Sequence, residues 1–313
     1  MFDAVTALNT AQLIIMSIMV ASTPLWLAAL GELVAERAGV LNLGVEGMMV
    51  MGAVCGFIAS YTTGSALVGV VAAILAGMAM AALFALLTLF LVTNQVATGL
   101  ALTLLGLGLS ALIGQSYANI GGVKIMPIHI PGLSDIPFIG GVLFGHDPLI
   151  YLTIALTAGV SWFLFRTRGG LIVRAVGDNH TSAHALGYSV VRVRFLAILF
   201  GGGCAGLAGA YLSMVATSQW LDHMTNGRGW IALALVVFAT WLPWRVAIGA
   251  LLFGAVSILQ FHAQALGISV PAQFLSSLPY IITVVVLVII SGNRLLARAN
   301  TPAMLGRSFV ADR

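Results

Sequence analysis

Residues 166–194 read RTRGGLIVRAVGDNHTSAHALGYSVVRVR. This polar segment is rich in arginine, within a chain that is otherwise mostly apolar, and it contains a single acid, Asp178. At its centre the sequence predicts a short helix over residues 180–186. Gly177-Asp178-Asn179 offers a turn and an N-cap, and Gly187 is suited to end the helix. A short capped helix between two apolar stretches has the form of a docking element for a cytosolic partner.

The composition defines the class of protein. The chain has 313 residues, of which 60% are hydrophobic and 7% charged, whereas soluble domains carry about 25% charged residues. We therefore expect an all-α, polytopic membrane protein. Residues 1–10 lack Lys and Arg, so we expect no secretory signal peptide, and the first apolar stretch should remain as a span. The net charge of +4 lies in loops and does not indicate nucleic-acid binding.

The apolar stretches predict about nine transmembrane helices, within a range of eight to ten, in a single domain covering residues 1–313. They are 11–30, 40–60, 64–92, 96–114, 149–166, 194–217, 228–242, 244–261 and 274–291. Most approach the ~20 residues that cross a bilayer. The stretch 228–242 is short, which favours a half-helix or a re-entrant element inside the protein.

The positions of Lys and Arg predict the orientation. If residues 166–194 are cytoplasmic and the spans alternate, only Lys124 and Arg228 fall outside. The other basic residues then lie inside: Arg37, Arg166, Arg168, Arg174, Arg192, Arg194, Arg245, Arg294, Arg298, Arg307 and Arg313. This places the N-terminus outside and the C-terminus inside. Residues 115–148, rich in Pro and Gly, then form a structured outer loop that can meet an extracytoplasmic partner.

Two glycine-flanked breaks are candidates for a transport pathway. Asn42 and Glu46 lie between Gly39, Gly44 and Gly47, and an ionisable residue near membrane depth is a functional-site hypothesis. The alternative is that Glu46 caps its own helix at the interface. Glu32 and Glu36, four residues apart, read as a solvated interfacial turn.

The second break contains Asn226 and Gly229, which permit a sharp turn into the membrane, with a plain polar loop as the alternative. Asn94 begins another span and is either a pathway residue or an interfacial cap. The glycines of GGGCAGLAGAY (201–211) predict a face for close helix packing.

Several chemistries lack support in the sequence. The chain has no Walker A motif, and its one lysine is Lys124, so it does not hydrolyse ATP by that route. Cys55 and Cys204 predict neither a disulfide nor a metal site. His180 and His184, spaced i and i+4, favour a solvated helix face over a metal site. We expect no cofactor in this chain and no enzymatic activity.

Five stretches together carry a family resemblance: GELVAERAGVLNLGVEGMMVMGA, NQVATGLALTLLGLGL, FRTRGGLIVRAVGDNHTSAHALGYSVVRVR, GRGWIALALVVFATW and LPYIITVVVLVI. They resemble the simple-sugar and nucleoside ABC importer permeases, within the branched-chain amino acid and ribose permease superfamily. The resemblance covers roughly residues 10–295. It implies a type II-like importer transmembrane domain, in the bacterial plasma (inner) membrane.

The resemblance also implies partners. These are an ATPase that binds ATP and Mg²⁺, a second, different permease chain, and a substrate-binding lipoprotein of the basic-membrane-protein type. It identifies the loop 166–194 as the one that carries the coupling helix. The residues implied to dock on the ATPase are Arg174, Gly177, Asp178, Asn179, His180, His184 and Gly187. Family members often have Pro and Ala where this chain has His180 and His184.

We therefore expect the permease subunit of an ABC importer for nucleosides, purine bases or related simple sugars. The alternatives are a secondary transporter or channel for a small polar solute, and a membrane scaffold. A secondary transporter usually needs intramembrane ionisable groups, for which Glu46 is the main candidate. A scaffold does not explain the polar breaks.

Overall fold

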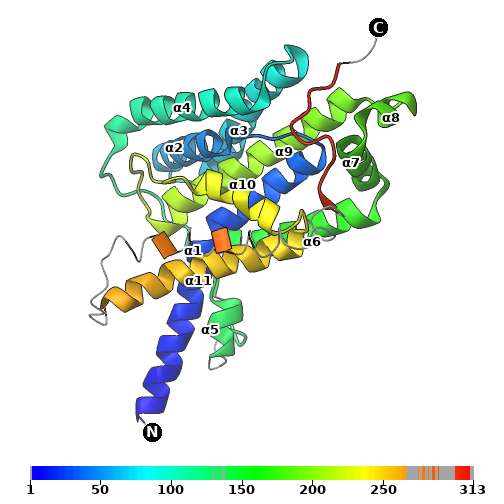
Figure 1. Cartoon of the computed structure of the whole chain (residues 1–313). Helices are drawn as coiled ribbons and strands as arrows, with labels where there is room; N and C mark the ends of the chain where they lie inside the picture. Colours follow the sequence, from blue (N-terminus) through cyan, green and yellow to red (C-terminus); the bar gives the residue numbers. More distant parts are fainter. Residues whose placement is uncertain are drawn as a thin grey trace.

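The structure is a computed structural model. It describes residues 2–129, 131–134, 136, 138–265 and 300–310, together with isolated positions between 274 and 288. These residues form helices joined by turns and irregular segments (Figure 1). The α-helices are α1 (Phe2–Arg37), α2 (Val45–Thr63), α3 (Ala66–Ala85), α4 (Gln95–Gly114), α5 (Ile139–Phe144), α6 (Pro148–Arg166), α7 (Arg168–Asp178), α8 (His180–Ala185), α9 (Val190–Tyr211), α10 (Arg228–Phe238) and α11 (Pro243–Ala265). Two π-helices, η1 (Leu86–Phe90) and η3 (Leu212–Ala216), and the 3-10 turn η2 (Gln115–Tyr117) complete them.

Seven of the described helices are long and apolar enough to cross a membrane. They cover Thr10–Arg37, Val45–Thr63, Ala66–Phe90, Gln95–Tyr117, Pro148–Arg166, Val190–Ala216 and Pro243–Gln260, which matches seven of the predicted stretches. The stretch 228–242, predicted to be short, contains α10, whose 11 residues span only ~16 Å. The predicted span 274–291 lies outside the continuously described residues.

The predicted turn at residues 177–178 is wrong. Gly177 and Asp178 are the last residues of α7, and the break in the helix falls at Asn179. Residues buried along α7 recur every three or four positions, at 170, 173, 176 and 177. This spacing buries one face of a helix, so α7 lies with that face against the protein.

The glycines of α9 let three neighbouring helices approach its backbone closely. A side chain at Gly206 would overlap the backbone of Ala73 in α3, and one at Gly209 would overlap the backbone of Met49 in α2. A side chain at Gly31 of α1 would overlap Cys204. The predicted packing face is therefore confirmed, and α9 is the central helix, in contact with α1, α2 and α3.

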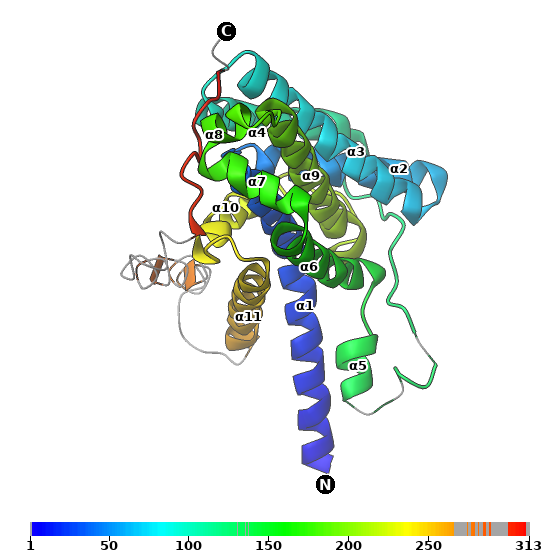
Figure 2. The same ribbon diagram turned by 90° about the vertical axis from the view of Figure 1, so that its right-hand side faces the viewer.

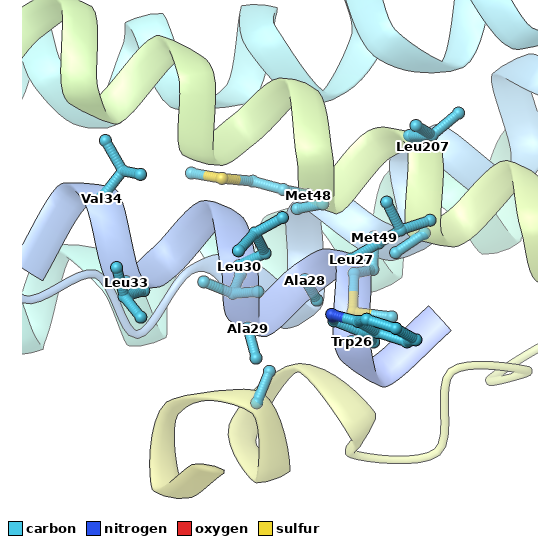
Figure 3. Packing of buried hydrophobic residues seen from close by; sticks show 14 of the residues in the cluster. Trp26, Leu27, Ala28, Ala29, Leu30, Leu33, Val34, Met48, Met49 and Leu207 are labelled. Carbon is cyan, nitrogen blue, oxygen red and sulfur yellow. The ribbon is translucent and has the colours of Figure 1, made fainter. Parts of the chain in front are cut away.

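The apolar core lies between these helices. Figure 3 shows Leu27 and Leu30 of α1 beside Met48 and Met49 of α2, with Leu207 of α9 nearby. All five side chains are buried. Dispersion contacts between such closely packed apolar groups add to helix association in lipid, where the hydrophobic effect between helices is small.

The first half of α1 projects from the bundle beside α5, whereas its second half is buried (Figures 1 and 2). Pro24 separates the halves and lacks the N–H of a regular helix. At another end of the molecule α7, α8 and the C-terminal segment 300–310 lie together, at the start of α9 (Figure 2).

Candidate functional site

Glu46, in the first turn of α2, holds the N-terminus of the short helix α10. Its Oε1 accepts hydrogen bonds from the Thr225 hydroxyl (2.6 Å) and from the Gly227 N–H (2.7 Å), and its Oε2 accepts from the Gly229 N–H (2.6 Å). The side chain is 3% exposed. The first N–H groups of a helix have no partner within it, and the helix dipole favours an anion there. Glu46 therefore caps a neighbouring helix.

The backbone around Gly229 fits this carboxylate closely. Asn226 and Gly227 both have positive φ, 47° and 78°, which turns the chain so that successive N–H groups converge on Glu46. A side chain at Gly229 would come within 2.5 Å of the Glu46 backbone. Close contact between α10 and α2 thus requires glycine at this position.

The non-helical segment 38–44 between α1 and α2 is fixed by polar side chains of the protein. Asn42 is 1% exposed, its N–H donates to Glu32 Oε1 (3.1 Å), and its Oδ1 accepts from the Gly44 N–H (2.9 Å). Gln95 Oε1 accepts from the Leu41 N–H (2.9 Å). These bonds satisfy backbone groups that the break in the helix leaves open, as burial requires.

The C-terminal end of α10 is tied to α1. The Trp241 indole N–H donates to Glu36 Oε2 (2.6 Å), and the Arg37 Nε and Nη2 donate to the Trp241 carbonyl at 3.2 and 3.0 Å. Glu32 and Glu36 are each 1% exposed, so their interpretation as a solvated turn is wrong. The short helix is therefore held at both ends by acidic and basic side chains of α1 and α2.

A cavity of about 590 Å³ lies beside the N-terminus of α10. Its wall is mostly apolar, with polar groups from Ser17, Thr217 and Arg228. Its other lining residues are Leu13, Met16, Val20, Ala21, Pro24, Leu212, Ala216, Met224 and Ile258. Three irregular features border it: the proline in α1, the π-helix η3 and the start of α10. An apolar cavity with a few polar groups is the usual form of a small-molecule site, and π-helical turns are frequent at functional sites.

A second polar cluster lies around α8. Asn179 caps this helix, since its Oδ1 accepts from the Ser182 N–H (2.9 Å). At the other end the Gly187 N–H donates to the His184 carbonyl (2.8 Å) and the Tyr188 N–H to the Ala183 carbonyl (3.1 Å), the two bonds of a Schellman motif. Gly187 has φ +88°. The predicted short helix and both of its ends are confirmed.

The fully buried Arg194 joins α9 to this cluster. It donates to the Ala38 carbonyl (3.1 Å), to the Arg307 carbonyl (2.8 Å) and to His180 Nδ1 (3.1 Å). Burial, together with the positive charges of Arg194 and Arg307, lowers the pKa of His180 below its usual 6.5. The His180 ring therefore stays neutral at pH 7, with Nδ1 as an acceptor.

The residues predicted to dock differ in their exposure to solvent. Asp178, Asn179, His184 and Gly187 are exposed, and His180 is half-buried. Gly177 is buried. A side chain at this position would overlap the Arg37 carbonyl, so Gly177 allows α7 to pack closely against the end of α1. Arg174 is half-buried with its guanidinium over the Phe165 ring, 5.2 Å from the centroid.

Of the residues predicted to line a pathway, four lie close together in the structure and one lies elsewhere. The structure brings Glu46 together with Gly229 and the turn at Asn226, and Asn42 lies in the segment that precedes Glu46. Asn94 is exposed and caps α4, where its Oδ1 accepts from the Ala97 N–H (3.0 Å). No group of three or more metal-ligating side chains occurs among the described residues.

These features define a class of protein: a multi-pass membrane transport protein, with a half-helix beside a cavity and a capped helix on an arginine-rich face. Residues 14–291 match the family described as "Branched-chain amino acid transport system / permease component". The chain belongs to this family. It is a permease subunit of an ABC importer, and ATP hydrolysis resides in a separate subunit.

Curated relatives match over most of their length. The putative glucose ABC transporter permease TsgC13 of Haloferax volcanii is 42% identical over 85% of this chain and 88% of its own. The nucleoside ABC transporter permease NupC of Lactococcus lactis is 30% identical over 93% and 96%. The guanosine ABC transporter permease NupQ of Bacillus subtilis is 31% identical over 95% and 96%. No solved structure matches the chain.

Proposed function

We propose that this permease moves nucleosides, purine bases or related simple sugars into the cell. The observation that carries the proposal is the near full-length similarity to permeases named for a nucleoside, for guanosine and for glucose. Nucleosides, purine bases and simple sugars share polar groups on a compact ring, and the nucleosides and sugars also carry several hydroxyl groups.

The cavity beside α10 supports this substrate class. Its apolar wall suits the face of a ring, while Ser17, Thr217 and Arg228 offer a few polar groups near the N-terminus of α10. Such a lining gives a polar, uncharged solute partners without enclosing it in charge. We place the translocation pathway here, with Glu46 and Gly229 fixing the helix that borders it.

The complete importer in this proposal contains three further kinds of subunit. An ATPase that binds ATP and Mg²⁺ docks on α8, a second permease chain completes the pathway, and an extracytoplasmic lipoprotein delivers the substrate. The distribution of arginines favours an outer N-terminus and an inner C-terminus. In this orientation the loop 115–148 meets the lipoprotein and the loop 166–194 meets the ATPase.

Uptake into proteoliposomes that contain both permeases, the ATPase and the lipoprotein tests the substrate class. We expect ATP-dependent uptake of labelled guanosine or glucose, with no uptake when ATP is replaced by a non-hydrolysable analogue. Uptake driven by an ion gradient without ATP would favour the alternative of a secondary transporter. Failure to accumulate any nucleoside, base or sugar would reject the proposed substrates.

The role of α8 is tested with two glycines that share a backbone conformation. Gly187 ends α8 and Gly64 ends α2, both with positive φ and with open space where a side chain would lie. Valine at either position strains the backbone by about 1–2 kcal/mol. We expect Gly187→Val to reduce ATPase binding and uptake, and Gly64→Val to leave binding intact. Equal effects of the two substitutions would contradict docking at α8.

A further inference from the structure

The C-terminal segment 300–310 is bound to the face that carries α8 by a series of backbone contacts. The Asn300 carbonyl accepts from Arg37 Nη1 (3.0 Å), and the Met304 N–H donates to the Gly177 carbonyl (2.9 Å). The Gly306 N–H donates to the Gly39 carbonyl (3.2 Å). The segment runs beside α7 and α8 in Figures 1 and 2.

Arg194 makes this segment and α8 interdependent. The same guanidinium donates to the Arg307 carbonyl and to His180 Nδ1, and the side chain is fully buried. A buried cation is costly unless its donors are satisfied. One buried side chain thus links the position of α8 to the position of the C-terminal segment.

Phe309 then forms part of the surface around α8. Its ring lies edge-on to two histidine rings of that helix, with centroids 5.2 Å from His180 and 5.3 Å from His184. With Tyr188 and the start of α9 it encloses a hollow of about 280 Å³, lined by His184, Gly187, Tyr188, Ser189, Val190, Val191 and Phe309.

Residues within two positions of this hollow's lining in the sequence expose apolar groups and positive charge. Leu186 is 78% exposed and Val310 68% exposed, and Arg192 and Arg307 are also exposed. Water-facing apolar groups around a hollow mark an interaction surface, and the arginines favour an acidic partner surface. A partner that suits both features presents an apolar side chain surrounded by carboxylates.

We propose that the ATPase docks on a composite surface made of α8 and the C-terminal segment, and inserts an apolar side chain into the hollow that Phe309 walls. This inference rests on the proposed function, because it assumes docking at α8, and it adds a second element to that interface. The C-terminal segment both positions α8 and contacts the ATPase directly.

Cross-linking from Val310 tests direct contact without disturbing the hollow. Val310→Cys and, on α8, Thr181→Cys are made in a chain lacking Cys55 and Cys204, and the assembled importer is treated with a short thiol-to-amine reagent. The one lysine of this chain is Lys124, so intramolecular products are rare. We expect both positions to cross-link to the ATPase. A cross-link from Thr181→Cys without one from Val310→Cys overturns the composite surface, whereas the loss of both in an active importer contradicts docking at α8 itself.

Binding measurements on single variants test the hollow. Phe309→Ala should weaken ATPase affinity by about tenfold or more, as expected for a buried aromatic residue at the centre of an interface. Phe309→Leu should retain part of the affinity. Leu171→Ala, which removes an exposed apolar group of α7 outside the hollow, should have no effect. Unchanged affinity for Phe309→Ala contradicts the proposal, and so does an equal loss for Leu171→Ala.

Discussion

The start of α10 and the surface around α8 are each organised by one buried charged side chain, and the two charges are opposite. Glu46 accepts from three donors of the segment 225–229, whereas Arg194 donates to two carbonyls and one histidine ring. In both clusters the charge meets mainly backbone groups that lie far away in the sequence. A single side chain thereby determines where a remote segment runs.

The two clusters differ in what surrounds them. Close backbone contact at Gly229 leaves no space between α10 and α2, so the start of α10 cannot shift without moving α2. In the Arg194 cluster, by contrast, one of the acceptors is the backbone carbonyl of Arg307, and Arg307 is an exposed residue. This difference indicates a fixed helix beside the proposed pathway and an adjustable surface at the proposed docking site.

The largest expected effect follows from removing the Glu46 carboxylate. Glu46→Leu leaves three donors without their acceptor, two of them backbone N–H groups, each at a cost of about 1–3 kcal/mol. We expect loss of uptake and a clearly lower midpoint of thermal unfolding in detergent. Glu46→Gln keeps one acceptor oxygen but turns an NH₂ group toward a donor, so its effect should be intermediate. Wild-type stability in Glu46→Leu would show that the capping contact is dispensable.

A smaller effect is expected from Arg194→Met. The variant keeps much of the apolar stem but leaves the Ala38 and Arg307 carbonyls and His180 without a donor. Because Arg307 is exposed, water can replace part of this loss, and we expect about 1–3 kcal/mol. Hydrogen exchange should show faster amide exchange in the segment 304–309 and in α8, with α2 and α10 unchanged. Exchange that increases equally in all four segments would contradict the separation of the two clusters.

The smallest effect is a pH dependence of the α8 cluster. The pKa of His180 is lowered in the folded protein by burial and by Arg194 and Arg307, so the unfolded chain binds the proton first as the pH falls below about 6.5. Folding stability from this group is therefore complete above pH 6.5 and decreases below it, by at most ~1.4 kcal/mol per pH unit.

Comparison with His180→Gln isolates this dependence, since glutamine does not titrate. Unfolding midpoints measured between pH 7.5 and 5.5 should fall more steeply in the wild-type protein than in the variant. Parallel pH profiles would show that protonation of His180 does not reduce the folding stability of the protein.

The sequence predicted the local features of both clusters well. Asn179 and Gly187 identified the ends of α8, and the glycines near 39–47 and 226–229 identified the two breaks. Capping and turn residues act over a few neighbouring positions, so a local pattern contains enough information to find them. The predicted turn at Gly177 and Asp178 is wrong because α7 buries one face, with a spacing of three or four residues, and continues as a helix to Asp178.

The pairing of the segments could not be predicted in the same way. Nothing near Glu46 indicates that its partners follow 179 to 183 residues later, and nothing near Phe309 indicates two histidines of α8. Glu32 and Glu36 looked solvated because acids on one helix face usually are. Their burial depends on Trp241 and on the folding of segment 38–44, which are tertiary contacts.

We expect the cavity beside the fixed start of α10 to belong to the translocation pathway, and thiol accessibility tests this claim. Ser17→Cys and Thr217→Cys, at the cavity wall, are compared with Asn94→Cys, at the exposed cap of α4, in a complete importer lacking Cys55 and Cys204. A small membrane-impermeant thiol reagent should label both cavity positions, at rates that change with substrate and with nucleotide, while labelling at position 94 stays constant. Cavity positions that remain unlabelled, or that react at one rate in every state, would contradict the claim.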